Sequence, residues 1–196
     1  MGFIVDESGT RFDPDKISPI MEYPRPKNMK QLRRYLGMCS WFLRYLPKYS
    51  TIAESLLKLT RKDVPYVWDT ACEDAFCILR EKLTSAPILA RPSFQKEYVI
   101  ECDASNTGLD SVLLQREEDG SPRVIAYASR TLTASERIFF VTERELLAIL
   151  FSIRKFRCYV KEDHFRVISD HSCLQWIFKL QNPSGRLARW ALELQQ

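Results

Sequence analysis

Alternating hydrophobic and polar positions mark the second half of the chain. In the stretch YVIECDASNTGLDSVLLQ, from Tyr98 to Gln115, the alternation predicts two strands joined by a tight turn at Asn106–Gly108. Later in the chain, periodicity predicts a strand at 124–129, a long helix from about 142 and a strand at 164–170. It also predicts a helix near 174–178 and another over 185–196. Three strands in hairpin order, a crossover helix and a further strand predict a mixed α/β sheet.

The first ninety residues have helical spacing instead. After a short strand, a turn and an extended return within residues 1–17, apolar spacing predicts three helices, over 28–47, 50–62 and 70–85. Asn28 with Gln31, and Thr70 with Glu73, have the spacing of capping boxes. This half is therefore expected to form a small helical unit, and it shows no catalytic constellation.

Charge is distributed unevenly within this helical part. No acidic residue lies between Glu22 and Glu54, and the interval holds seven basic residues, Arg25, Lys27, Lys30, Arg33, Arg34, Arg44 and Lys48. They are interleaved with the aromatic residues Tyr35, Trp41, Phe42, Tyr45 and Tyr49. Basic side chains neutralise phosphates and aromatic rings stack on bases, so the pattern favours nucleic-acid binding. The alternative is a solvated basic face with its aromatic residues in the core.

Composition excludes several classes of protein. The chain of 196 residues is 45% hydrophobic and 28% charged, which argues against disorder. Six cysteines without a Cys-x-x-Cys pair argue against structural zinc and favour a reducing compartment. No apolar run approaches the roughly 20 residues of a membrane span, and the N-terminus does not resemble a signal peptide. We therefore expect an intracellular protein, in cytoplasm or nucleus. Because Met1 begins almost inside a strand, we expect a piece of a longer chain.

Three acidic residues occupy related positions in the α/β pattern. Asp103 and Asp170 each end a predicted strand, and Glu145 lies in the first turn of the long helix. If the two strands pair in parallel, both aspartates lie at one end of the sheet, where the helix can bring Glu145. Three such carboxylates need a cation, and their hard oxygens select Mg²⁺ or Mn²⁺. The alternatives are a solvated turn residue for Asp103, a capping acid for Glu145 and a helix cap for Asp170.

Seven segments resemble the pol polyprotein of gypsy-type LTR retrotransposons, in family order and over nearly the whole chain. They are RPKNMKQLRRYLGMCSWFLRYLP, VWDTACEDAFCILREKLTSAPILA, ECDASNTG, VIAYASRTLTASE, TERELLAI, ISDHSCLQWIF and PSGRLARWALELQ. The resemblance implies that residues 1–92 are the end of the reverse-transcriptase palm with the helical thumb and connection. It implies that residues 93–196 are a ribonuclease H-like domain, which cleaves the RNA strand of an RNA–DNA hybrid.

The resemblance also implies a site and its partners. The metal-binding acids would be Asp103 of Asp-Ala-Ser, Glu145 (rather than Glu143) of Glu-Leu-Leu-Ala, and Asp170 of Ser-Asp-His. Two Mg²⁺ or Mn²⁺ ions are expected in an intact site, with an RNA–DNA hybrid or other nucleic acid, and the rest of the polyprotein, as partners.

Two departures from the family pattern bear on activity. The fourth metal-binding aspartate of the family, with the last strand of its domain, lies beyond Gln196, and no Tyr-x-Asp-Asp polymerase motif is present. Asp110 stands where the family usually has glycine, so it either faces solvent or brings an unpaired charge into the sheet. We therefore expect weak or absent hydrolysis from these residues. The alternative function is a non-catalytic nucleic-acid-binding protein derived from a retroelement.

Overall fold

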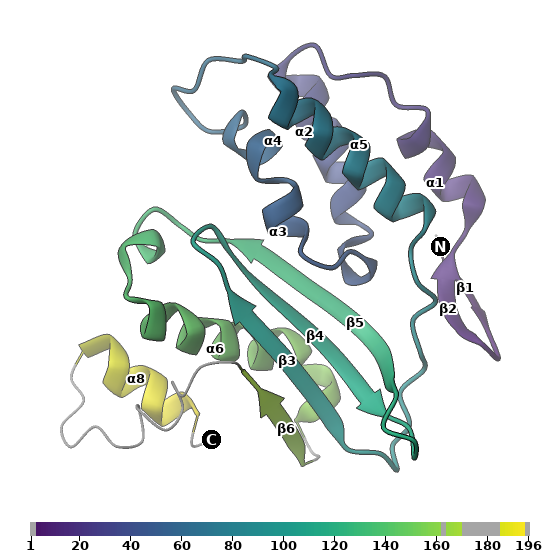
Figure 1. Cartoon of the computed structure of the whole chain (residues 1–196), viewed down its shortest axis with the longest axis vertical. Coiled ribbons are helices and arrows are strands. Elements are labelled where there is room, and N and C mark those ends of the chain that lie inside the picture. The colour runs from purple at the N-terminus through teal and green to yellow at the C-terminus, as the bar shows by residue number, and fades with distance from the viewer. Residues whose placement is uncertain (1–2, 162–163, 170–184, 195–196) are drawn as a thin grey trace.

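The computed structural model describes residues 3–161, 164–169 and 185–194. Figure 1 shows two parts, a helical unit and a sheet with a long helix behind it, and the two parts are in contact through η1, α3, β4 and β5. We call residues 3–92 the helical unit and the described residues from 93 onward the α/β domain.

The helical unit begins with an antiparallel hairpin of two short strands, β1 (Phe3–Asp6) and β2 (Gly9–Phe12). Its helices are α1 (Pro14–Met21), α2 (Met29–Ser40), the 3₁₀ turn η1 (Leu43–Tyr45), α3 (Tyr49–Ile52), α4 (Glu54–Lys58) and α5 (Thr70–Thr84). The predicted stripe of α5 is buried, with Leu79 and Leu83 fully inaccessible. A helical unit in this half of the chain is therefore confirmed.

Local boundaries in this unit differ from the predictions. The extended segment that was predicted to continue to residue 17 is wrong beyond Asp13, because helix α1 begins there. The Asp13 side chain caps α1 by accepting a hydrogen bond from the Asp15 amide at 3.1 Å, and Pro14 is the first helical residue. Likewise, the cap of α5 is Asp69, whose carboxylate accepts from the Cys72 amide at 2.9 Å, and Thr70 is already helical. Both caps are aspartates one residue outside the helix.

The helix predicted over 28–47 ends at Ser40. The Ser40 hydroxyl donates to the Gly37 carbonyl at 2.7 Å, and the Trp41 amide donates to Met38 instead, three residues back. The last turn therefore tightens, and the chain continues through η1. The helix predicted over 50–62 is divided into α3 and α4 at Ala53.

The α/β domain has the predicted mixed sheet. Its strands are β3 (Tyr98–Ala104), β4 (Gly108–Arg116), β5 (Pro122–Thr131) and β6 (Phe165–Ile168), in the spatial order β5-β4-β3-β6. The first three are antiparallel neighbours, and β6 lies parallel to β3 with Ile168 opposite Glu101. The connections include η2 (Glu136–Ile138) and α6 (Val141–Val160), and α8 (Gly185–Glu193) matches the predicted helical tail. The helix predicted near 174–178 lies outside the described residues.

The two faces of the sheet are covered by different elements. Helix α6 packs on the face that carries Ile100 and Leu113, both fully buried. The helical unit packs on the other face, through η1 and α3 (Figure 1). There the Ser50 amide donates to the Ser129 hydroxyl of β5 at 2.7 Å, and the Arg44 guanidinium lies 3.4 Å from the Ile125 carbonyl oxygen. The helical unit therefore lies beside the end of β3 on this face of the sheet.

Candidate functional site

Asp103 lies near the end of β3, where its side chain is exposed. Its partner on β4 is Asp110, and the partner of Asp110 on β5 is Ser129. Residues that face each other in antiparallel strands project to the same side of the sheet, so the two carboxylates share one face. A cavity of about 270 Å³, which we call the Asp103 cavity, is bordered by both aspartates and by Ile168 of β6.

The environment of Asp110 disfavours its charge. Burial raises the pKa of this carboxyl most, and the neighbouring Asp103 raises it further, whereas a hydrogen bond with Ser129 and the charge of Lys48 act in the opposite direction. Its Oδ1 atom is buried without a hydrogen-bond partner among the described residues. The structure therefore agrees better with the expectation that Asp110 brings an unpaired charge into the sheet than with the expectation that it faces solvent.

Glu145 lies in the N-terminal part of α6 and is only 8% exposed. The capping contact of this helix is made by Glu143, whose Oε2 accepts from the Phe140 amide at 3.0 Å. Arg186 of α8 also donates to Glu143, at 2.5 Å. Glu143, not Glu145, is therefore the structural acid of this helix start.

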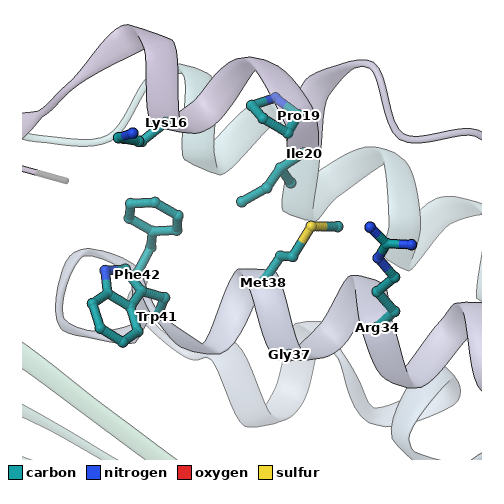
Figure 2. A pocket seen from close by; sticks show the side chains of 8 residues that line it. All are labelled: Lys16, Pro19, Ile20, Arg34, Gly37, Met38, Trp41 and Phe42. Atoms are coloured by element: carbon teal, nitrogen blue, oxygen red, sulfur yellow. The ribbon is translucent and has the colours of Figure 1, made fainter. Parts of the chain in front are cut away.

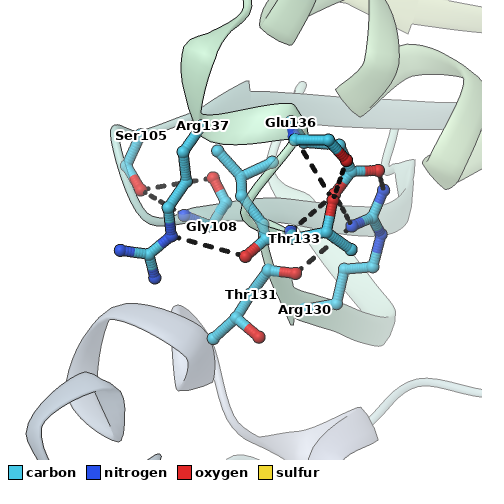
Figure 3. A network of polar contacts seen from close by, with 9 residues as sticks. Ser105, Gly108, Arg130, Thr131, Thr133, Glu136 and Arg137 are labelled. Atoms are coloured by element: carbon cyan, nitrogen blue, oxygen red, sulfur yellow. Dashed lines mark hydrogen bonds and ion pairs between the residues drawn. The ribbon is translucent and has the colours of Figure 1, made fainter. Parts of the chain in front are cut away.

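Arg144, beside Glu145, joins α6 to the turn that follows Asp103. Its Nη1 donates to the Asn106 side chain at 2.6 Å and to the Ser105 carbonyl at 3.3 Å. The Ser105 hydroxyl in turn accepts from the Gly108 amide at 2.9 Å, as Figure 3 shows. The start of α6 and the end of β3 are thus held together. The sequence gives no spacing signal for this contact, because its partners are 38 residues apart.

A second set of contacts fixes the end of β5 beside the same turn (Figure 3). Both terminal nitrogens of Arg130 donate hydrogen bonds to the Glu136 carboxylate, at 2.7 and 2.9 Å. Glu136 also accepts from the Thr133 amide, at 2.8 Å, and the Thr133 hydroxyl accepts from the Glu136 amide, at 3.3 Å. This reciprocal pair of hydrogen bonds fixes the turn that leads into η2 and holds the end of β5 in place.

Replacing Arg144 by methionine should lower the free energy of unfolding by roughly 1 kcal/mol, because two hydrogen bonds from a half-buried cation are lost. The control is Arg157→Met, on an exposed position of the same helix. Urea unfolding followed by circular dichroism measures both. Equal midpoints for the two variants would contradict the role given to Arg144.

Asp170 lies outside the described residues, so its predicted position beside Asp103 stays a prediction. The parallel pairing on which that prediction depends is confirmed, since Ile168 lies opposite Glu101. Within residues 3–161, 164–169 and 185–194, no three or more His, Cys, Asp or Glu side chains are grouped so that they could hold a metal ion.

The seven basic residues of the helical unit fall into two groups. Arg25 pairs with Glu73 at 3.4 Å, Arg33 donates to the Thr60 carbonyl at 3.0 Å, and Arg44 lies in the interface with β5. The other four side chains are exposed and make no ion pair or hydrogen bond within the described ranges: Lys27, Lys30, Arg34 and Lys48.

The interleaved aromatic residues are mainly structural. Tyr35, Phe42, Tyr45 and Tyr49 are all buried, as the alternative interpretation required, whereas Trp41 is 69% exposed. Trp41 borders a cavity of about 560 Å³ between α1 and α2, with Lys16 and Arg34 also on its wall (Figure 2). Aromatic surface and positive charge therefore remain together at one place on this unit.

The mixed sheet, its crossover helix and the acid at the end of β3 define a ribonuclease H-like α/β domain. Residues 93–196, more than half of the chain, match the family described as the RNase H-like domain found in reverse transcriptase. The chain belongs to this family. Within the described ranges, no helix has the length and apolar character needed to cross a bilayer.

Relatives among characterised proteins agree with the resemblance to retrotransposon pol polyproteins. The chain is 34% identical, over its whole length, to the retrovirus-related Pol polyprotein from transposon 412 of Drosophila melanogaster, of which it covers 16%. It is 30% identical, again over its whole length, to the transposon Tf2-3 polyprotein of Schizosaccharomyces pombe, of which it covers 15%. The chain thus spans less than a fifth of either relative.

Solved structures share the fold over the whole chain. The foamy viral protease-reverse transcriptase in complex with dsDNA superimposes with a TM-score of 0.81 at 20% identity, and 42% of that chain is covered. The same protein in complex with an RNA/DNA hybrid gives a TM-score of 0.78 at 21% identity, with 27% covered. At these identities the likeness establishes the common fold of helical unit and α/β domain.

Proposed function

We propose that this chain carries the ribonuclease H site of a retroelement reverse transcriptase and hydrolyses the RNA strand of an RNA–DNA hybrid. The observation that supports it most is the tie between α6 and the β3–β4 turn. Arg144 joins the helix that carries Glu145 to the turn that follows Asp103. This contact ties the start of α6 to the turn after β3, beside the parallel strand β6, and we propose that Glu145 and Asp103 meet at this corner.

The donor set fits hard divalent cations. Asp103 is an exposed carboxylate, and the unpartnered Oδ1 of Asp110 makes the cavity beside it favourable for positive charge. Asp103, Glu145 and Asp170 are the residues that we propose to hold two Mg²⁺ or Mn²⁺ ions. When bound, such ions supply an activated water and stabilise the leaving oxygen of a phosphodiester.

The helical unit has a separate role in this proposal. We assign residues 1–92 to the end of the palm with the thumb and connection, and residues 93–196 to the ribonuclease H-like domain. The four exposed cations of the unit are available to bind the phosphate backbone of a duplex. Polymerisation would require residues of the larger polyprotein, because this chain has no Tyr-x-Asp-Asp motif.

Cleavage of a labelled RNA–DNA hybrid in Mg²⁺ tests the nuclease assignment. We expect cleavage of the RNA strand by the wild-type chain only when Mg²⁺ is present. Asp103→Asn should abolish it, since a neutral amide is a much poorer ligand for a hard cation. Hybrid binding in EDTA by both proteins controls for folding. Equal cleavage by both proteins would sink the catalytic assignment.

Asp110 favours a second candidate, a non-catalytic nucleic-acid-binding protein. A repelling charge directly opposite Asp103 is a poor feature for a working site. On this account, hybrid binding is tight and falls steeply with salt, and no hydrolysis occurs at any Mg²⁺ concentration. The same cleavage assay, titrated with Mg²⁺, separates the two candidates.

A further inference from the structure

The Asp103 cavity is built from both parts of the chain. The sheet contributes Asp103 and Asp110, and the loop between η1 and α3 contributes Pro47 and Lys48. Lys48 is the one basic side chain among the described residues that border this cavity. The helical unit therefore adds a cation to a cavity whose sheet side is acidic.

The backbone of Lys48 is unusual for a lysine. Its φ of 52° and ψ of 34° lie in the left-handed region, which glycine and asparagine adopt at less cost. Such strain persists where the surroundings fix the chain, and it is concentrated at functional positions. Two residues further on, Ser50 is fully buried and its amide donates to Ser129, so the loop is fixed against the sheet.

The ammonium group of Lys48 is available to a ligand. The side chain is exposed and makes no ion pair or hydrogen bond with the part of the chain that the structure describes. Its charge nevertheless acts on Asp110, where it opposes the rise in pKa. Three carboxylates border the cavity, of which Glu101 is paired with Arg116 at 3.0 Å. A phosphate that approaches them is repelled, and a nearby lysine offsets that repulsion.

We propose that Lys48 binds a backbone phosphate of the hybrid at the Asp103 cavity, so that the nucleic-acid site of the α/β domain is completed by the helical unit. The proposal rests on the proposed function for the identity of its ligand. It separates Lys48 from the other exposed cations, which lie on α2 or before it and do not border this cavity.

Hybrid binding without hydrolysis tests the proposal. The probe is a fluorescein-labelled RNA–DNA hybrid in EDTA, with the dissociation constant measured by anisotropy at several KCl concentrations. Lys48→Met should weaken binding roughly threefold to tenfold and lower the slope of log Kd against log[KCl] by about one, as expected for one lost phosphate contact. Lys48→Gly should do the same while relieving the left-handed backbone, so poor folding does not explain the loss. Lys48→Arg should retain most of the affinity.

The control is Lys58→Met, an exposed lysine of α4 that does not border the cavity. It should leave both the affinity and the salt slope unchanged. Wild-type affinity and slope in both Lys48→Met and Lys48→Gly would overturn the proposal. Asp110→Asn, which removes a negative charge from the same cavity, should tighten binding. Weaker binding by Asp110→Asn would mean that no phosphate approaches this cavity and would also overturn the proposal.

Failure of this proposal differs from failure of the nuclease assignment. If Asp103→Asn cleaves as well as the wild type but Lys48 variants lose affinity, the nuclease assignment falls and the phosphate contact stands. If Asp103→Asn is inactive and Lys48 variants bind normally, the nuclease assignment stands and the phosphate contact of Lys48 falls. A wild-type chain with no measurable affinity for the hybrid overturns both.

Discussion

Gly108→Ala should destabilise the folded chain by roughly 1–3 kcal/mol, the range for forcing extra atoms into a packed site. A Cβ atom at Gly108 would lie 2.1 Å from the Ser50 hydroxyl oxygen, 2.7 Å from the Ser50 Cβ and 3.0 Å from the Arg130 carbonyl oxygen. Ser50 cannot easily move away, because it is fully buried and its amide donates to Ser129. The helical unit and the sheet must therefore separate slightly, or β4 must shift.

A glycine-to-alanine change also has a stabilising effect, which is smaller than the cost of this clash. Alanine in place of glycine restricts the unfolded chain and stabilises by about 0.4–1 kcal/mol where the native backbone is compatible. At Gly37, within α2, an added Cβ meets nothing within 4 Å, so Gly37→Ala should show this stabilisation without the clash. Urea unfolding of the two variants compares the same chemical change at an interface and at a free helix surface.

A compensating variant tests the cause. Ser50→Gly removes both of the Ser50 atoms that the new methyl group would meet, so it should recover part of the stability that Gly108→Ala loses. A Gly108→Ala protein as stable as the wild type would show that the two parts of the chain do not pack as described. So would a double variant less stable than the sum of the single changes predicts.

Much of the α/β domain could be predicted because its information is local. Alternation predicted β3, β4 and β5, and the parallel pairing of β6 with β3, on which the sequence argument was conditional, is present in the structure. The end of α5 followed from Ser85 and the proline after it. In each case the deciding residues lie within a few positions of the feature that they determine.

The missed features depend on particular hydrogen bonds and packing contacts, some local and some between distant residues, that hydrophobic periodicity does not encode. The end of α2 at Ser40 depends on a single side-chain hydrogen bond, which competes with a regular helical turn. Glu143, not Glu145, is the capping acid because the N-cap of α6 is Phe140, two residues before the Thr142 that the sequence pattern predicts. The contacts of Ser50 with Gly108 and Ser129, and of Arg144 with Asn106, join segments that have no shared sequence pattern.

The candidate site divides in the same way. Its place near a strand end, the two other acids and the family resemblance together selected Asp103 as a candidate, and Glu145 is buried in the structure. The pairing of Asp103 with Asp110 depends on the register of the hairpin, and the presence of Lys48 at the cavity depends on how the helical unit packs. Neither could be obtained from composition or charge along the chain.

Asp110→Asn should stabilise the folded chain at pH 7 by roughly 0.5–2 kcal/mol, the range for relieving one unfavourable charge. The amide keeps the size of the side chain and a hydrogen-bond partner for Ser129, but removes the repulsion from Asp103. Burial, followed by that repulsion, raises the pKa of Asp110 above its ordinary value of 3.8. The folded state therefore binds this proton more tightly than the unfolded state.

The pH dependence follows from that sign. Below the ordinary pKa, the aspartic acid is protonated in both states and the folded chain carries no charge penalty at this position. As pH rises from 3.8 through the raised pKa, the wild type loses stability relative to Asp110→Asn, and the difference is constant above that range. Urea unfolding at several pH values between 4 and 7 should show the two curves diverging as pH rises.

Asp119→Asn is the control of opposite sign. A hydrogen bond from Ser121 lowers the pKa of the exposed Asp119 carboxyl in the folded chain. As pH rises, Asp119→Asn should therefore become less stable than the wild type, whereas Asp110→Asn should become more stable. Adding Mg²⁺ extends the Asp110 experiment to the proposed metal site. A cation held beside Asp103 would offset the charge of Asp110, so Mg²⁺ should narrow the difference between wild type and Asp110→Asn. A difference that is independent of both pH and Mg²⁺ would mean that Asp110 affects stability through packing, not charge.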